Sequence, residues 1–144
     1  MPWVGTNYNK EGYEGKKILV LGESHYCDGN LASDGCCFPE CARTKFKDDC
    51  PDFTIGVIEW YLRKHQADEN SKWINTFIAF ERNLFGRALT KEEATDFWDR
   101  VIFYNYIQLA LPNSGVPPKA EYWKCSENAF KEIGNLIVCE ERDI

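Results

Sequence analysis

Short unbroken runs of apolar residues mark three segments of the chain as buried strands. The first covers residues 17–21 and ends at Gly22, and the second covers residues 101–106, which are rich in β-branched and aromatic side chains. The third is the run Leu136–Cys139. Apolar runs without polar alternation are typical of strands covered on both faces, as in a parallel sheet. The pattern therefore predicts three strands.

After the first strand, apolar positions recur at the spacing of a helix. Asp52 can cap a helix that fades near His65, and a second helix is expected over residues 71–85, where Gly86 can end it. The apolar side of this second helix is formed by Trp73, Phe77, Phe80 and Leu84. These segments predict a pair of amphipathic helices.

Two further helices are indicated by their ends. Residues 90–93, Thr-Lys-Glu-Glu, form a capping box, which predicts a third helix that runs into Val101. A fourth helix is expected over residues 119–133, and Gly134 can end it. Helices therefore separate all three predicted strands.

Strands that alternate with helices predict the α/β class, here a three-layer α/β/α sandwich with a short parallel sheet. We expect one domain over residues 1–144, with a Cys-rich loop at about 22–51. Three strands make a thin sheet for this architecture, and the last one lies at the end of the chain. We therefore expect either that the domain is truncated at its C-terminus or that the last strand pairs with another chain.

Composition narrows the classes of protein that remain. Of 144 residues, 44% are hydrophobic and 15% aromatic, which is too apolar for a disordered chain. No apolar run approaches the ~18 residues of a membrane span, and the N-terminus does not resemble a signal peptide, so we expect a soluble, cytoplasmic protein. The net charge of −6 argues against a face that grips duplex DNA by its phosphates. A nucleic-acid role would have to come from a pocket.

Seven cysteines raise the question of a metal, and five of them fall within one short segment. These are Cys27, Cys36, Cys37, Cys41 and Cys50. An odd total without a secretory signal predicts reduced thiols. The sequence establishes no cofactor, but zinc suits such thiolates best, with His25 as an optional nitrogen ligand. The spacing lacks paired CxxC motifs, which favours free thiols in a loop over a metal site.

Residues that can do chemistry follow the first two predicted strands, where ligands bind in open parallel sheets. They are Gly22, Glu23, Ser24, His25 and Tyr26 after the first strand, and Tyr104, Asn105 and Gln108 at the second.

Each of these residues has a chemical role and a structural alternative. Glu23 or His25 could act as a general base on water, whereas Ser24 could position a water but is a poor base. Asn105 offers one acceptor and two donors in a plane, and tyrosines can stack on a base. Alternatively, Gly22 is only a turn residue and Asn105 only an Asx turn or helix cap.

Two motifs give these residues a family resemblance. Residues 22–27, Gly-Glu-Ser-His-Tyr-Cys, and residues 103–108, Phe-Tyr-Asn-Tyr-Ile-Gln, resemble the uracil-DNA glycosylase superfamily, and most closely a group of bacterial proteins related to it. In that superfamily a Gly-Glu-type loop holds the water-activating residue, and a later strand ends in an Asn that reads the flipped base. The resemblance assigns these roles to the Gly22–Glu23 loop and to Asn105, and places Cys125 in the following helix. The sequence departs from the pattern at Ser24, at His25, which replaces a Pro, and in lacking the late His-Pro-Ser loop.

The resemblance implies a nucleobase- or nucleotide-binding protein, with hydrolysis of an N-glycosidic bond in DNA repair as its reaction. Glu23, Ser24 and His25 would be catalytic, and the partner would be single-stranded or damaged DNA, or a free nucleobase or nucleotide. The alternative is a non-catalytic binding or structural module whose cysteine loop holds zinc.

Overall fold

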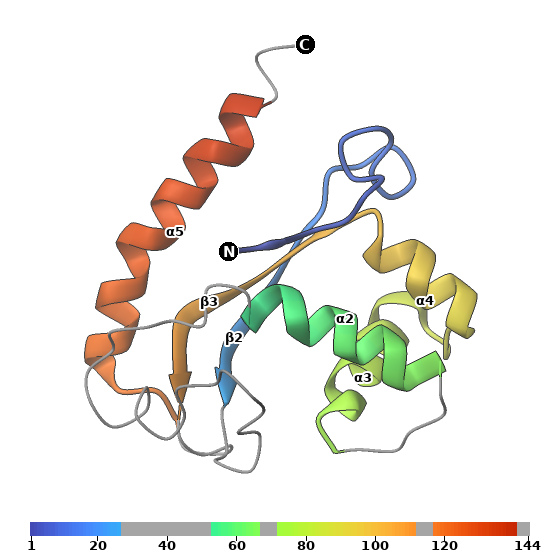
Figure 1. Cartoon of the computed structure of the whole chain (residues 1–144), viewed down its shortest axis with the longest axis horizontal. Helices are drawn as coiled ribbons and strands as arrows, with labels where there is room; N and C mark the ends of the chain where they lie inside the picture. Colours follow the sequence, from blue (N-terminus) through green and yellow to red (C-terminus); the bar gives the residue numbers. More distant parts are fainter. Residues whose placement is uncertain (27–52, 67–71, 112–116, 141–144) are drawn as a thin grey trace. The chain divides into compact units, whose positions relative to one another are not determined.

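The computed structural model describes residues 1–26, 53–66, 72–111 and 117–140, and in these ranges it contains three strands and four helices (Figure 1). They are β1 (Trp3–Val4), β2 (Leu19–Tyr26), α2 (Phe53–Gln66), α3 (Ile74–Phe85), α4 (Lys91–Trp98), β3 (Ile102–Leu111) and α5 (Ala120–Glu140). The predicted α/β class is confirmed.

Two compact units make up the chain. The first unit comprises Met1–Val20 and Asp52–Tyr104, and the second comprises Leu21–Pro51 and Asn105–Ile144. Strands β2 and β3 each contribute residues to both units, and each unit is described by itself below.

The sheet is mixed, although a parallel one was predicted. Its strand order is β1-β3-β2, and β1 is antiparallel to β3, with Trp3 opposite Phe103 and Val4 opposite Ile102. Strands β2 and β3 are neighbours and run in the same direction (Figure 1). The two-residue β1 was not predicted, because two residues are too few to show a pattern and its partner lies far along the chain.

Both parallel strands are longer than predicted. Strand β2 continues through Gly22 as far as Tyr26, and β3 continues to Leu111. Residues 22–26 were expected to begin a loop, but each strand offers the other a ladder of hydrogen bonds that a single Gly does not interrupt. The remainder of the predicted loop lies outside the described residues.

The third predicted strand is wrong. Helix α5 runs from Ala120 to Glu140, so it passes through Gly134 and includes the run Leu136–Cys139. A short apolar run does not by itself distinguish a strand from a buried helical segment, and Gly in a helix costs only about 1 kcal/mol relative to Ala. Self-association through a C-terminal strand loses its basis with this correction.

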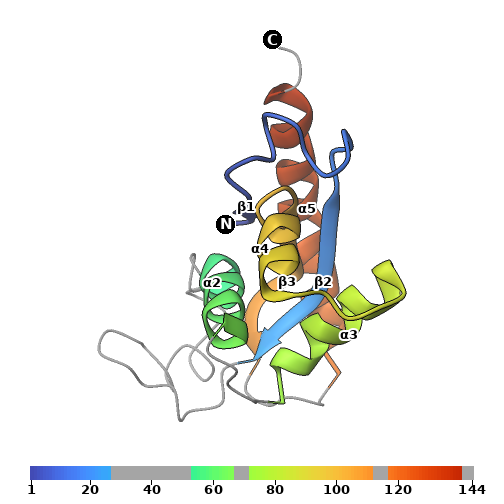
Figure 2. The same cartoon turned by 90° about the vertical axis from the view of Figure 1, so that its right-hand side faces the viewer.

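The three helices of the first unit begin and end close to the predicted residues. Gly86 ends α3 with a left-handed φ of 69°. The predicted capping box begins α4: the Thr90 hydroxyl accepts the Glu93 N–H (3.2 Å), and the Glu93 carboxylate accepts the Thr90 N–H (2.8 Å). Helix α2 contacts α3, α4 and β1. Figure 2 shows α2 beside α4.

Aromatic rings fill the core of the first unit. Trp98 and Phe97, at the end of α4, are fully buried. The Trp98 ring lies edge-on to Phe103 of β3 and to Phe77 of α3, with centroid separations of 5.8 and 5.7 Å. Edge-to-face packing of this kind adds to the stabilisation from burial of apolar surface. The core therefore ties α3 and α4 to the start of β3.

The N-terminal segment is anchored to the turn after α4. The Thr6 N–H and the Asn7 side-chain amide donate to the two carboxylate oxygens of Asp99, at 2.9 and 2.6 Å. The Gly5 N–H donates to the carbonyl oxygen of Val101 (3.0 Å). These bonds hold β1 beside β3.

In the second unit, α5 packs on β3. The Tyr106 ring lies 5.6 Å from that of Trp123 and 5.2 Å from that of Phe130, measured between centroids. No helix in the described part of the chain is long and apolar enough to cross a membrane.

Candidate functional site on strands β2 and β3

All eight residues predicted to form the strand-end site lie within the two parallel strands. Gly22, Glu23, Ser24, His25 and Tyr26 are in β2, and Tyr104, Asn105 and Gln108 are in β3. Neighbouring strands thus carry the two motifs, but within the strands rather than in loops after them. The side chains of His25, Tyr26 and Gln108 lie outside the described part of the structure.

Alternation along the strands divides these residues between two faces of the sheet. Val20 and Phe103 belong to one buried hydrophobic cluster, so they mark the same face. Ser24 lies four residues after Val20, and Asn105 two residues after Phe103, which puts both on that face. Ser24 and Asn105 are therefore the described pair that can meet a common ligand.

Glu23 and Tyr104 belong to the opposite face. Glu23 is exposed, whereas Tyr104 is 1% exposed and lies on the side of β3 that carries Tyr106, whose ring contacts α5. Because adjacent residues of a strand point to opposite faces, Glu23 does not share a face with Asn105. The predicted residues are thus split into two sets.

One ladder bond indicates which residues lie side by side. The Ile102 N–H donates to the carbonyl oxygen of Ile18 (3.0 Å). A regular parallel ladder continued from this bond would put Gly22 beside Asn105. Since Gly has no Cβ, it would leave room next to the Asn105 side chain.

Two polar groups on the Ser24–Asn105 face are buried, the Asn105 side chain and the Ser24 hydroxyl oxygen. Asn105 is only 4% exposed, although its side chain is an amide. The Ser24 hydroxyl oxygen is buried and has no hydrogen-bond partner in the described structure. A buried polar group without a partner costs about 1–3 kcal/mol, so a ligand or water that bonds to it would be favoured.

The predicted metal site cannot be placed. Cys27, Cys36, Cys37, Cys41 and Cys50 all lie outside the described residues, as does the side chain of Cys125. Within the described ranges, no group of three or more His, Cys, Asp or Glu side chains could hold a metal ion. Zinc binding by the cysteine loop stays a prediction.

A buried carboxylate in the first unit was missed. Glu81 of α3 is 2% exposed, and one of its oxygens accepts hydrogen bonds from the Tyr61 hydroxyl of α2 and the Trp98 indole N–H of α4, both at 2.7 Å. The sequence did contain a signal. Glu81 follows Ile74 by seven residues and Phe77 by four, which is the spacing of one helix face.

Aromatic side chains surround Glu81, and the pKa of one of them, Tyr61, is raised. Burial raises the pKa of Tyr61 well above its ordinary value of 10.0, and the hydrogen bond to Glu81 raises it further. The His65 ring stacks on Tyr61 with centroids 5.4 Å apart. Because its donors come from α2 and α4, Glu81 links all three helices of the unit, which indicates a structural role.

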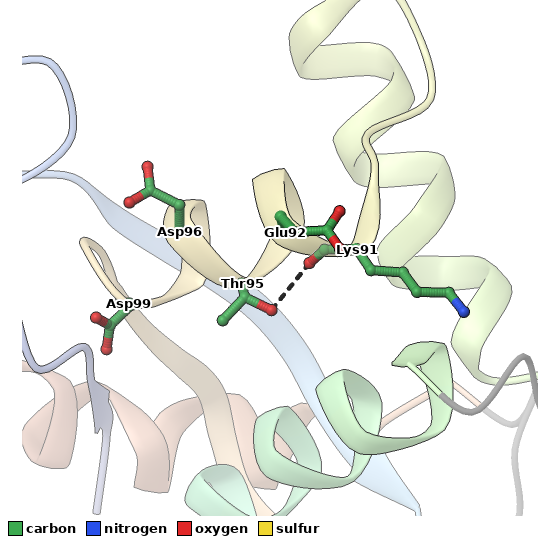
Figure 3. A pocket seen from close by; sticks show the side chains of 5 residues that line it. All are labelled: Lys91, Glu92, Thr95, Asp96 and Asp99. Atoms are coloured by element: carbon green, nitrogen blue, oxygen red, sulfur yellow. Dashed lines mark hydrogen bonds between the residues drawn. The ribbon is translucent and has the colours of Figure 1, made fainter.

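A surface hollow along α4 is lined by acidic side chains (Figure 3), and two of them, Asp96 and Asp99, already have structural roles. Its lining residues are Lys91, Glu92, Thr95, Asp96 and Asp99. The Thr95 hydroxyl donates to the Lys91 carbonyl oxygen (2.9 Å), Asp96 accepts from Arg100 Nε (2.7 Å), and Asp99 anchors the N-terminal segment. The Ser24–Asn105 face therefore remains the better candidate site.

No family model, curated protein or solved structure matches this sequence.

Proposed function

We propose that the chain binds a nucleobase or nucleotide through Asn105 and Ser24, and that it hydrolyses an N-glycosidic bond there. The observation that carries the proposal is the buried Ser24 hydroxyl, which has no hydrogen-bond partner among the described residues and lies on the same sheet face as the buried Asn105 amide. An amide offers a donor and an acceptor side by side, which matches the edge of a pyrimidine. The motif resemblance to uracil-DNA glycosylases supports the same ligand class and a three-layer sandwich of that kind.

In this proposal one side chain binds the base and the other positions the attacking water. Asn105 would hold the edge of the base, and Ser24 would orient a water toward the sugar carbon C1′. The C1′–N bond breaks with its electron pair on the base, a C1′–O bond forms to the water, and one water proton ends on the base nitrogen. Because a neutral hydroxyl is a weak base, Ser24 would position the water rather than deprotonate it.

Glu23 has no assigned step in this proposal. Its side chain is exposed and belongs to the other face of β2, so it is not aimed at a base held by Asn105. Replacing Glu23 by Gln is therefore expected to leave binding unchanged.

The test measures free base released from uracil-containing single-stranded DNA, and binding of uracil and nucleotides by calorimetry. We expect wild type to bind and release base, and Asn105→Ala and Ser24→Ala to lose both. Asn75→Ala, at an exposed position of α3, is the matched control. Circular dichroism checks that each variant is folded. Binding without base release would leave a nucleobase-binding module, whereas neither binding nor release by the wild type would refute the proposal.

A further inference from the structure

Strand β2 presents an outer edge. It is the last strand in the order β1-β3-β2 that the described residues form, so its other edge has no strand beside it in that part of the structure. Leu21 is 50% exposed and Glu23 is exposed on the same face of this strand. An edge strand with unpaired backbone groups and an exposed apolar side chain is a template for another strand.

The ladder to β3 defines which backbone groups point outward. The Ile18 carbonyl oxygen accepts from Ile102, so the even-numbered residues of β2 direct their backbone groups toward β3. The odd-numbered residues then direct theirs toward the outer edge. Leu19, Leu21 and Glu23, together with Lys17 just before the strand, therefore supply the outward backbone donors and acceptors.

The side chains of these same four residues form a self-complementary pattern. In order they are basic, apolar, apolar and acidic: Lys17, Leu19, Leu21 and Glu23. Reversing the strand exchanges the positive end with the negative end and leaves leucines between them. The pattern is therefore symmetric about Val20, with opposite charges at its two ends.

We infer that two copies of the chain pair through β2, antiparallel and two-fold symmetric about Val20. Leu19 then lies opposite Leu21 of the second copy, and Lys17 lies opposite Glu23. All of these are odd-numbered residues, so each such pair can exchange backbone hydrogen bonds. The two-fold axis makes every contact twice, as in an isologous dimer, and joins two sheets into one.

Other registers fit less well. Centring the pair on Leu21 puts Glu23 opposite Leu19, and centring it on Gly22 puts Glu23 opposite Leu21. In both cases the carboxylate loses its cationic partner. Lys17 already donates to the Tyr8 carbonyl oxygen, but an ammonium group has three donors and can also bind a carboxylate. The dimer joins the outer edges of two β2 strands through the backbone groups of odd-numbered residues, and it does not depend on the proposed function.

Charge reversal tests the register directly. In sedimentation equilibrium of the full chain, wild type is expected to form a dimer. Lys17→Glu and Glu23→Lys should each weaken dimerisation by at least about tenfold, because like charges then face each other across both pairs. An equimolar mixture of these two variants, and the double variant Lys17→Glu/Glu23→Lys, should each restore the dimer.

Matched controls are Lys124→Glu and Glu132→Lys, which reverse exposed charges on α5 and should not change dimerisation. Circular dichroism verifies folding, and the double variant remains informative where a single variant fails to fold. A wild type that stays monomeric, a dimer indifferent to the single reversals, or an equal loss in the controls would each overturn the inference.

Discussion

Replacing Glu81 is expected to destabilise the first unit, and the number of hydrogen bonds that each variant loses determines how large the loss is. Glu81 accepts from Tyr61 and Trp98 on a single oxygen, and it is 2% exposed. In Glu81→Ala both donors lose their acceptor inside the core. In Glu81→Gln the side-chain carbonyl oxygen can occupy the same place and accept both bonds.

The magnitudes follow from the cost of unpaired buried donors. Each one costs about 1–3 kcal/mol, so Glu81→Ala should lose on the order of 2–6 kcal/mol, with the cavity left behind adding to this. Glu81→Gln gives up only the charge assistance, about 1 kcal/mol. Tyr61→Phe removes one bond of the two and should fall between them, at about 1–2 kcal/mol.

Urea unfolding followed by tryptophan fluorescence and circular dichroism measures these differences. Glu132→Ala, on the exposed side of α5, is the control and should change the free energy of unfolding by less than about 0.5 kcal/mol. Glu81→Gln as damaging as Glu81→Ala, or Glu81→Ala as mild as the control, would refute the reasoning.

Three further predictions concern other contacts of the first unit. Gly5→Ala should lower the midpoint of thermal unfolding, because a Cβ at Gly5 would lie 2.3 Å from the backbone carbonyl of Asp99, and a Thr6→Ala control should not. The hydrogen bonds from Arg87 hold the pKa of Glu93 at about 2, below its usual 4.5. The ionised Glu93 therefore stabilises the fold fully above pH 4.5, and this contribution is lost as the pH falls toward 2. In Glu93→Gln the free energy of unfolding should change less between pH 4.5 and pH 2 than in wild type. Because the pKa of Tyr61 is raised in the folded chain, the protonated hydroxyl stabilises the fold fully below pH 10.0, and this contribution is lost as the pH rises further. Chemical unfolding between pH 8 and pH 11 should show the free energy of unfolding falling in wild type. An equal fall in Tyr61→Phe would contradict this explanation.

Local signals predicted the helices of the first unit well. Gly86 ends α3 because the backbone there is in the left-handed conformation, which Gly adopts easily. The capping box at Thr90 begins α4. Both signals depend on backbone groups within a few residues of one another, so no tertiary information is needed. The predicted apolar stripe of α3 was less accurate, because Leu84 is 53% exposed and Glu81 occupies a core position instead. Tertiary donors from two other helices make that burial possible.

The strands depend on pairing, and the sequence alone was a weaker guide to them. The polar residues from Glu23 to Tyr26 remain in β2 beside its neighbour β3, and the run at 136–139 is helical in continuation of α5. The site residues were found by motif, but their division between faces required strand boundaries. Because Glu23 was expected in a loop, the alternation of side chains along a strand could not be used to place Glu23 and Asn105 on opposite faces of the sheet.

The most direct test of the proposed site compares thermal unfolding of wild type and Ser24→Ala, each with and without uracil or a nucleotide. Since the Ser24 hydroxyl is buried and has no hydrogen-bond partner in the part of the chain that the structure describes, its removal should stabilise the free chain by about 1–3 kcal/mol. A bound ligand should raise the unfolding midpoint of wild type by mass action, and Ser24→Ala should lose this rise. A wild type whose midpoint no such ligand shifts, or a Ser24→Ala variant with an unchanged shift, would contradict the assignment of the site.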